Sequence, residues 1–255
     1  MTTRDFSAFA ARYSWPTGKQ NFPYCIGHRG ASGHKTENTL ASFELASQLG
    51  ADMWELDTQL TRDGVVMVSH DDHLQRVFGV DKRISQLTAA ELAALDICVP
   101  SFAEVAELGR RLGTGLYVEL KAPGSGLNCW RELLTHNQHF ACFGSFDTAR
   151  VRELRDAGCD FPLSVLVRVG HDPHALGDSA GADILHLCWE RAAERPQDLV
   201  TPELLRRAFD KGREIVLWHE ERPAILADLM ALPVLGICTD FPDLMRPGST
   251  RRQLA

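Results

Sequence analysis

Three acidic residues occupy positions from which they could share one cation. Glu55 and Asp57 are two residues apart in the apolar run DMWELD, and Glu119 lies near the end of LYVEL. Side chains two residues apart on a strand point the same way, with Cα atoms roughly 6.6 Å apart, so both can reach one ion. Hard cations such as Mg²⁺ and Ca²⁺ prefer oxygen ligands. We therefore expect these residues to hold a divalent metal, with the choice between Mg²⁺ and Ca²⁺ left open.

Cationic side chains accompany these acids. Arg29 follows His28 in YCIGHRG, Lys121 lies two residues after Glu119, and His70 ends the stretch VVMVSH. Imidazole titrates near neutral pH, so the two histidines are candidate proton carriers. Arg29 and Lys121 could bind an anionic substrate. The alternative is a salt-bridge network between acids and cations, although three acids exceed what two cations need.

Three further polar or aromatic residues have two interpretations each. Trp218 ends an apolar run and could either pack or form a wall for substrate. Glu37 and Asn38 precede a helical pattern, where either could cap the helix or hold a water at the metal site. We expect capping.

The elements that must position these residues alternate along the chain. Short apolar runs rich in β-formers occur at residues 24–28, 52–57, 116–120, 140–145, 162–167, 183–189, 214–219 and 235–240. Helical periodicity follows most of them. Eight alternating units in about 250 residues are typical of an α/β fold of the (β/α)8 TIM-barrel type. We expect one domain over residues 1–255, with its active site at the carboxyl ends of the strands, where the candidate residues lie.

One irregularity follows the second strand. Asp63 and Gly64 separate two strand-like runs, which predicts a β-hairpin. Residues 71–100 then form an insertion before a helix that starts at Ser101, with Glu104 three residues later as in a capping box. An insertion after the carboxyl end of a strand is expected to cover the barrel mouth, the end of the barrel at which the strands finish.

Composition excludes several classes of function. The net charge is −7, the pI is about 5.8 and the basic residues are scattered, so we expect no nucleic-acid partner. The seven cysteines contain no C-x-x-C pair and do not indicate a disulfide framework. No secretory signal and no membrane span are visible, which favours a cytoplasmic location. The oligomeric state is not determined by these features.

Two long segments resemble a known family. GHRGASGHKTENTLASFELASQLGAD and WELDTQLTRDGVVMVSHDDHLQR, followed in order by VELK, GSFD and CTDFPD, resemble the glycerophosphodiester phosphodiesterases over nearly the whole chain. The resemblance implies a TIM barrel that hydrolyses small-molecule glycerophosphodiesters to glycerol 3-phosphate and an alcohol. It further implies a divalent metal on Glu55, Asp57 and Glu119, with His28 and His70 as acid and base.

The chain departs from the pattern of this family in two places. It reads KTENT where the family often reads P-E-N-T, and LWHEERPA where W-T-V-N is commoner. His219 and Glu220 therefore replace a small polar pair near the substrate, which affects the preference for the alcohol group.

Three other functions remain open from the sequence. A lysophospholipase D-like activity on lysolipids would use the apolar stripe within residues 84–100. A catalytically silent barrel could bind phosphodiesters, although every candidate position holds a competent residue. A metal-dependent aldolase or isomerase could use paired carboxylates but would not need two histidines and an arginine. We favour a small soluble diester as the substrate.

Overall fold

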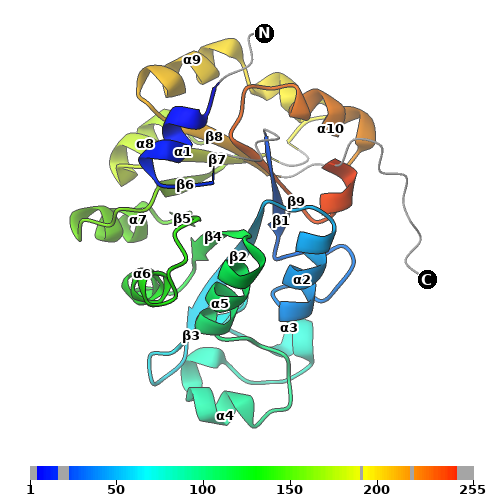
Figure 1. The fold of residues 1–255 in the computed structure, drawn as a ribbon, viewed down its shortest axis with the longest axis vertical. Coiled ribbons are helices and arrows are strands. Elements are labelled where there is room, and N and C mark those ends of the chain that lie inside the picture. The colour runs from blue at the N-terminus through cyan, green and yellow to red at the C-terminus, as the bar shows by residue number, and fades with distance from the viewer. Residues whose placement is uncertain (1–4, 17–22, 190–191, 219–220, 246–255) are drawn as a thin grey trace.

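The computed structural model describes residues 5–16, 23–189, 192–218 and 221–245. Within these segments eight parallel strands close into a barrel, because β1 pairs with both β9 and β2 (Figure 1). The strands are β1 (Tyr24–His28), β2 (Met53–Leu60), β4 (Gly115–Leu120), β5 (Ala141–Ser145), β6 (Leu163–Arg168), β7 (Ile184–Cys188), β8 (Glu214–Trp218) and β9 (Gly236–Thr239). The predicted (β/α)8 architecture is confirmed.

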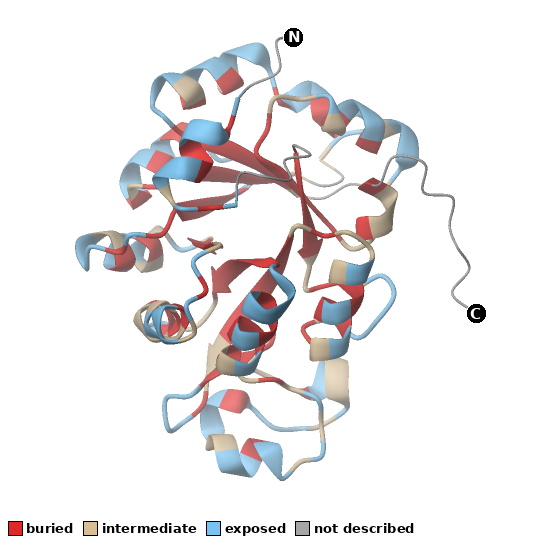
Figure 2. Cartoon of the chain, in the orientation of Figure 1, coloured by how far each residue is buried: buried red, intermediate tan, exposed pale blue. Residues whose placement is uncertain are grey.

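Helices cover the outside of the barrel. They are α2 (Leu40–Gln48), α5 (Phe102–Leu112), α6 (Ser125–Thr135), α7 (Thr148–Asp156), α8 (Pro173–Ala180), α9 (Pro202–Asp210) and α10 (Pro223–Met230). Their inner faces are buried against the strands and their outer faces are exposed (Figure 2). One apolar core lies between helices and strands, and a second fills the barrel interior. The last strand is followed by a short 3-10 turn, η3 (Pro242–Met245).

Local sequence signals explain several helix ends. Ser101 and Glu104 form the predicted capping box of α5, with the Ser101 hydroxyl accepting from the Glu104 amide. The same helix ends at Gly113, which adopts a left-handed backbone with φ 67°.

The hairpin after β2 is confirmed. β2 continues to Leu60 and pairs antiparallel with β3 (Val66–Val68), and the turn between them places Gly64 at φ 83°.

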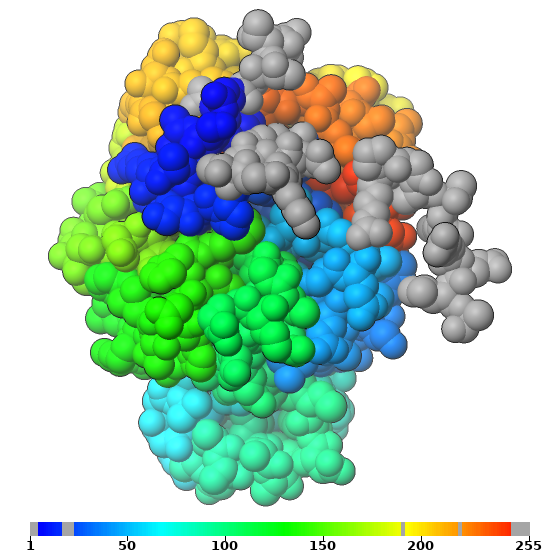
Figure 3. All heavy atoms as spheres, in the orientation of Figure 1, coloured from blue at the N-terminus to red at the C-terminus, as the bar shows by residue number. Residues whose placement is uncertain are grey.

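The insertion that follows the hairpin forms a small lobe. It contains α3 (Gln75–Phe78), η1 (Ile84–Gln86) and α4 (Ala89–Ala93), and it projects below α2 and α5 in Figures 1 and 3. Ile84 and Leu92 are buried in a separate apolar cluster of this lobe. Arg76 of the lobe binds Glu37, which in turn binds Arg29 at the end of β1. Coverage of the mouth by the rest of residues 71–100 stays a prediction.

The amino-terminal segment closes the opposite end of the barrel. Helix α1 (Ser7–Arg12) precedes Trp15, whose ring packs edge-on against Tyr24 and Phe140, with centroid distances of 5.9 and 5.1 Å. Tyr24 begins β1 and Phe140 directly precedes β5, so this aromatic cluster lies where the strands start. The floor of the barrel is therefore sealed by residues far from the predicted site.

Candidate active site at the carboxyl ends of the strands

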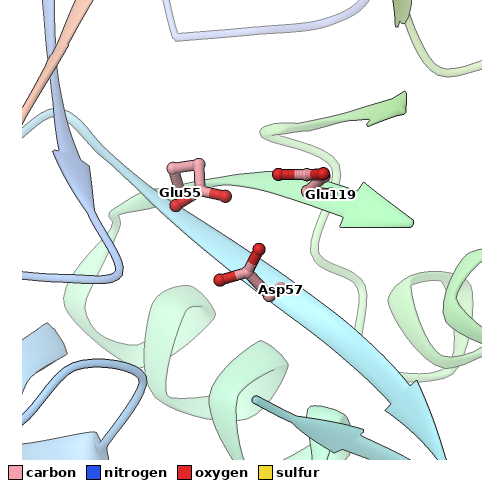
Figure 4. A group of neighbouring side chains, drawn as sticks. All are labelled: Glu55, Asp57 and Glu119. Carbon is pink, nitrogen blue, oxygen red and sulfur yellow. The ribbon is translucent and has the colours of Figure 1, made fainter. Parts of the chain in front are cut away.

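The three predicted metal ligands converge. Glu55 and Asp57 come from β2 and Glu119 from β4, and the strand register places Asp57 directly beside Glu119. One carboxylate oxygen from each lies within 4.8 Å of the others, and the three side chains face one another (Figure 4). All three residues are buried. The alternation of side chains on β2 and the pairing of β2 with β4 are sufficient to bring these acids together.

Two cations lie against these acids. Lys121 Nζ is 3.2 Å from Asp57 Oδ1 and 2.7 Å from Glu119 Oε1. Arg29 Nε is 3.2 Å from Asp57 Oδ2. The salt-bridge network considered from the sequence is therefore present. Three carboxylates still outnumber the two cations, and Arg29 is also shared with Glu37.

The surroundings of the three acids shift their pKa values unequally. Burial, followed by repulsion from Asp57 and Glu119, raises the pKa of Glu55 well above its usual range. Burial and the Asp57 charge raise the pKa of Glu119 to about 7. Burial also opposes ionisation of Asp57, but Lys121 and Arg29 hold its pKa well below the usual value. The excess negative charge and the all-oxygen donor set fit a hard divalent cation.

His28 is held between an acid and an aromatic ring. Its Nδ1 is 2.5 Å from Asp240 Oδ1, and its Nε2 is 3.8 Å from Glu55 Oε2. The indole of Trp218 packs against the imidazole with a centroid distance of 4.9 Å. One ring nitrogen therefore faces a fixed carboxylate, while the other faces the group of acids.

His70 has a similar arrangement. Its Nδ1 is 2.7 Å from Asp71 Oδ1, and Asp71 also accepts from Arg76. Burial lowers the pKa of His70, although the Asp57 charge acts in the opposite direction. Asp71 thus holds the ring of its neighbour in one orientation.

A single cavity unites the predicted residues. It is lined by His28, Arg29, Glu55, His70, Glu119, Lys121, Phe146, Leu166, His186, Cys188, Trp218 and Cys238. Asp57 is fully buried and bonded to the cations of this cavity.

A larger cavity of ≈ 840 Å³ lies between the start of α2 and the insertion, lined by residues such as Leu40, Phe78 and Val99. It contains none of the candidate histidines and none of the three acids. The chemistry therefore belongs to the smaller cavity.

The expectation that Glu37 or Asn38 caps α2 is wrong. Thr39 is the N-cap, with its hydroxyl accepting from the Ser42 amide. Asn38 adopts a left-handed backbone with φ 57°, and its amide donates to Asp57 Oδ2 at 2.9 Å. Glu37 accepts from Arg29 at 2.9 Å. The helix starts after both residues, which frees them to support the charged cluster.

Sequence reasoning gave no role to several other residues at this end of the barrel. Asp240 was recognisable as a polar residue after the last strand, but nothing in its spacing paired it with His28. Phe146 follows β5 and packs beneath the Arg168 guanidinium, 4.0 Å from its ring centroid. His186 lies within the apolar run of β7. Alternate side chains of a strand point into the barrel or toward the helices, and the sequence alone does not show which set includes His186. His219 and Glu220 lie outside the described residues.

Comparison with known proteins agrees with this geometry. The profile of the Glycerophosphoryl diester phosphodiesterase family matches residues 28–244. The chain belongs to this family. It is therefore a phosphoric diester hydrolase.

Individual members of the glycerophosphoryl diester phosphodiesterase family extend the similarity. The protein YhdW of Bacillus subtilis strain 168 is 30% identical, over 87% of this chain and 96% of that protein. A human lysophospholipase D is 49% identical over only 67 residues, which are 26% of this chain and 21% of that protein.

Solved structures of the family share the fold. The glycerophosphodiester phosphodiesterase of Thermotoga maritima is 27% identical and has a TM-score of 0.71, covering 89% of this chain and 98% of that one. A phosphodiesterase of Oleispira antarctica, solved with the product sn-glycerol-3-phosphate, is 22% identical with a TM-score of 0.72, covering 87% and 94%. None of the helices in the described segments is long and apolar enough to cross a bilayer.

Proposed function

We propose that this enzyme hydrolyses glycerophosphodiesters to glycerol 3-phosphate and an alcohol, with a divalent cation on Glu55, Asp57 and Glu119 and with His28 and His70 as acid and base. The observation that carries the proposal is the convergence of three buried carboxylates within 4.8 Å, in a cavity lined by both histidines. Family membership supplies the reaction class.

The cation, when bound, would supply positive charge that polarises a phosphoryl oxygen. Arg29 and Lys121 supply the remaining positive charge for the phosphate. The free volume of the cavity is only ≈ 50 Å³, well below that of typical ligand sites. Arg29 and Lys121 line this cavity while they contact Asp57, so both can reach a phosphate bound there.

The two histidines are arranged for proton transfer. A carboxylate at Nδ1 stabilises the tautomer that carries its proton there, so Nε2 is the nitrogen that takes or gives a proton during the reaction. Asp240 has this position beside His28, and Asp71 has it beside His70. One histidine protonates the leaving alkoxide while the other removes the proton of the nucleophile.

The preferred substrate is a small diester such as glycerophosphocholine or glycerophosphoethanolamine. The product bound to the Oleispira antarctica protein supports a glycerol phosphate unit in the site. Lysolipids are the second candidate, because of the local similarity to a lysophospholipase D. Against them, Ile84 and Leu92 of the insertion are buried in its own core instead of forming an exposed apolar rim. The cytoplasmic location stays a prediction from the sequence.

A substrate panel tests the proposal. Glycerophosphocholine, glycerophosphoethanolamine and lysophosphatidylcholine are incubated with the enzyme and Mg²⁺ or Ca²⁺, and products are identified by phosphorus NMR. We expect glycerol 3-phosphate from the two soluble diesters, and loss of turnover with EDTA that is restored by added metal. Turnover that survives EDTA would reject the metal assignment, and no hydrolysis of any diester would favour a silent barrel.

A further inference from the structure

A third histidine, His186, lines the cavity and, unlike His28 and His70, is buried; it has no role in the mechanism described above. His186 occupies the middle of β7, with Leu166 and Val216 as its neighbours in the strand register. It is 2% exposed and lines the cavity together with His28. Its surroundings also include Leu166, Cys188 and Cys238, which lack strong hydrogen-bonding groups.

The hydrogen bonds of His186 identify its tautomer. Its Nδ1 is 3.0 Å from Tyr117 Oη, and Tyr117 donates its hydroxyl proton to Ser164 Oγ at 2.5 Å. Because the tyrosine proton is directed to the serine, the tyrosine oxygen must accept from Nδ1–H of His186. Burial keeps this imidazole neutral by lowering its pKa to about 3. The proton therefore resides on Nδ1, and Nε2 carries a lone pair.

That lone pair has no partner within the described residues. His186 Nε2 is buried and accepts no hydrogen bond there. A buried acceptor without a partner is destabilising, and a ligand that donates a hydrogen bond to it removes that penalty. The phosphate of a diester substrate cannot be that partner at neutral pH, because its non-bridging oxygens carry negative charge and no proton. A hydroxyl group can.

The location of His186 indicates which part of the substrate it would contact. Tyr117 lies two residues before Glu119 on β4 and is paired in the strand register with Glu55, so the Tyr117–His186 pair lies beneath Glu119 and beside Glu55. The phosphate is bound by Arg29 and Lys121 near the mouth in the proposed function. The glycerol carbons and their hydroxyls then extend toward the acids and toward this pair.

We propose that His186 Nε2 accepts a hydrogen bond from a hydroxyl of the glycerol unit, making His186 a specificity-determining residue that selects glycerol phosphates over deoxy analogues. This inference rests on the proposed function. Tyr117 acts as a positioning residue, because its oxygen fixes which nitrogen of His186 carries the proton.

Ligand binding tests this inference without requiring turnover. Isothermal titration calorimetry in the presence of Mg²⁺ compares sn-glycerol 3-phosphate with 2-hydroxypropyl phosphate and 3-hydroxypropyl phosphate, each of which lacks one hydroxyl. We expect the wild-type protein to bind one analogue about 10- to 100-fold more weakly than glycerol 3-phosphate. In His186→Phe the ratio of dissociation constants, analogue over glycerol 3-phosphate, should fall at least about fivefold. His186→Gln keeps an acceptor oxygen and should retain part of this ratio.

A matched control exists in α8. His174 is also buried, with both ring nitrogens unpaired among the described residues, but it lies outside the cavity. His174→Phe should keep the wild-type ratio. If His186→Phe does not fold, Tyr117→Phe replaces it, and the ratio should again fall because the tautomer is no longer fixed.

Two outcomes would overturn the inference: a wild-type ratio retained in the folded His186→Phe or Tyr117→Phe variant, or a wild-type protein that binds all three ligands equally. Failure of the proposed function would be seen separately, as absence of glycerol 3-phosphate release from every diester.

Discussion

At the scale of single residues, the site consists of pairs in which one side chain fixes the proton position or the orientation of another. Asp240 and Asp71 each contact Nδ1 of a histidine, and Asn38 supports Asp57. Such neighbours fix which atom carries a proton and where it points. In the proposed mechanism, proton transfer therefore depends on residues that do not themselves reach the substrate.

Removal of either imidazole should slow the reaction. We expect His28→Ala and His70→Ala each to lower kcat by roughly 10²–10⁴-fold, the range for losing general acid–base assistance. Stopped assays of glycerol 3-phosphate release at saturating metal give the values. His73→Ala is the matched control, because His73 pairs with the exposed Asp81 in the insertion. Wild-type turnover in both site variants would remove the proposed proton carriers.

At the scale of elements, two parallel strands in register build the proposed metal site. Glu55 and Asp57 alternate with buried apolar residues on β2, and β4 brings Glu119 alongside. The loop after β1 contributes Arg29 in a left-handed conformation, with φ 53°, and its backbone amide donates to Glu55 at 3.0 Å. The strands therefore position the acids, and the first loop turns back to bind them.

A change on β2 should affect metal binding specifically. We expect Asp57→Asn to raise the Mg²⁺ or Ca²⁺ concentration for half-maximal activity by at least about tenfold, because one anionic oxygen of the set is lost. Metal titrations of activity and calorimetry of metal binding both report this change. Asp63→Asn, in the hairpin turn, should behave like the wild type. An unchanged metal requirement in Asp57→Asn would reject the ligand assignment.

At the scale of the whole molecule, an aromatic cluster that stabilises the fold and the residues of the candidate active site lie at opposite ends of the barrel. The cluster of Phe9, Trp15, Tyr24 and Phe140 seals the end at which the strands begin. The acids and histidines lie at the other end. Substitutions in the floor should therefore change the free energy of unfolding with little effect on turnover.

Trp15→Ala tests this separation. Trp15 is only 3% exposed, so truncation should cost about 3–5 kcal/mol of unfolding free energy. Denaturant unfolding measures the loss, and kcat below the unfolding transition should stay within about twofold of the wild type. Leu112→Ala, at a position 42% exposed, should change stability by less than about 1 kcal/mol. A large fall in kcat for folded Trp15→Ala would show that the two ends are coupled.

The amino-acid sequence alone determined the barrel, the order of its elements and the acids and histidines at the strand ends. This was possible because hydrophobic periodicity, caps such as Ser101 with Glu104, and residue spacing on one strand are local properties. The resemblance of two segments to a family supplied the expected reaction.

The tertiary structure alone decided which residues meet across the barrel. It paired His28 with Asp240, more than two hundred positions away, turned Asn38 from a presumed cap into a support for Asp57, and placed His186 in the cavity of the candidate site. The His28–Asp240 contact joins the ends of the first and last strands and depends on closure of the barrel, which no local pattern encodes. The Asn38–Asp57 contact joins a loop to the next strand and depends on the left-handed backbone of Asn38.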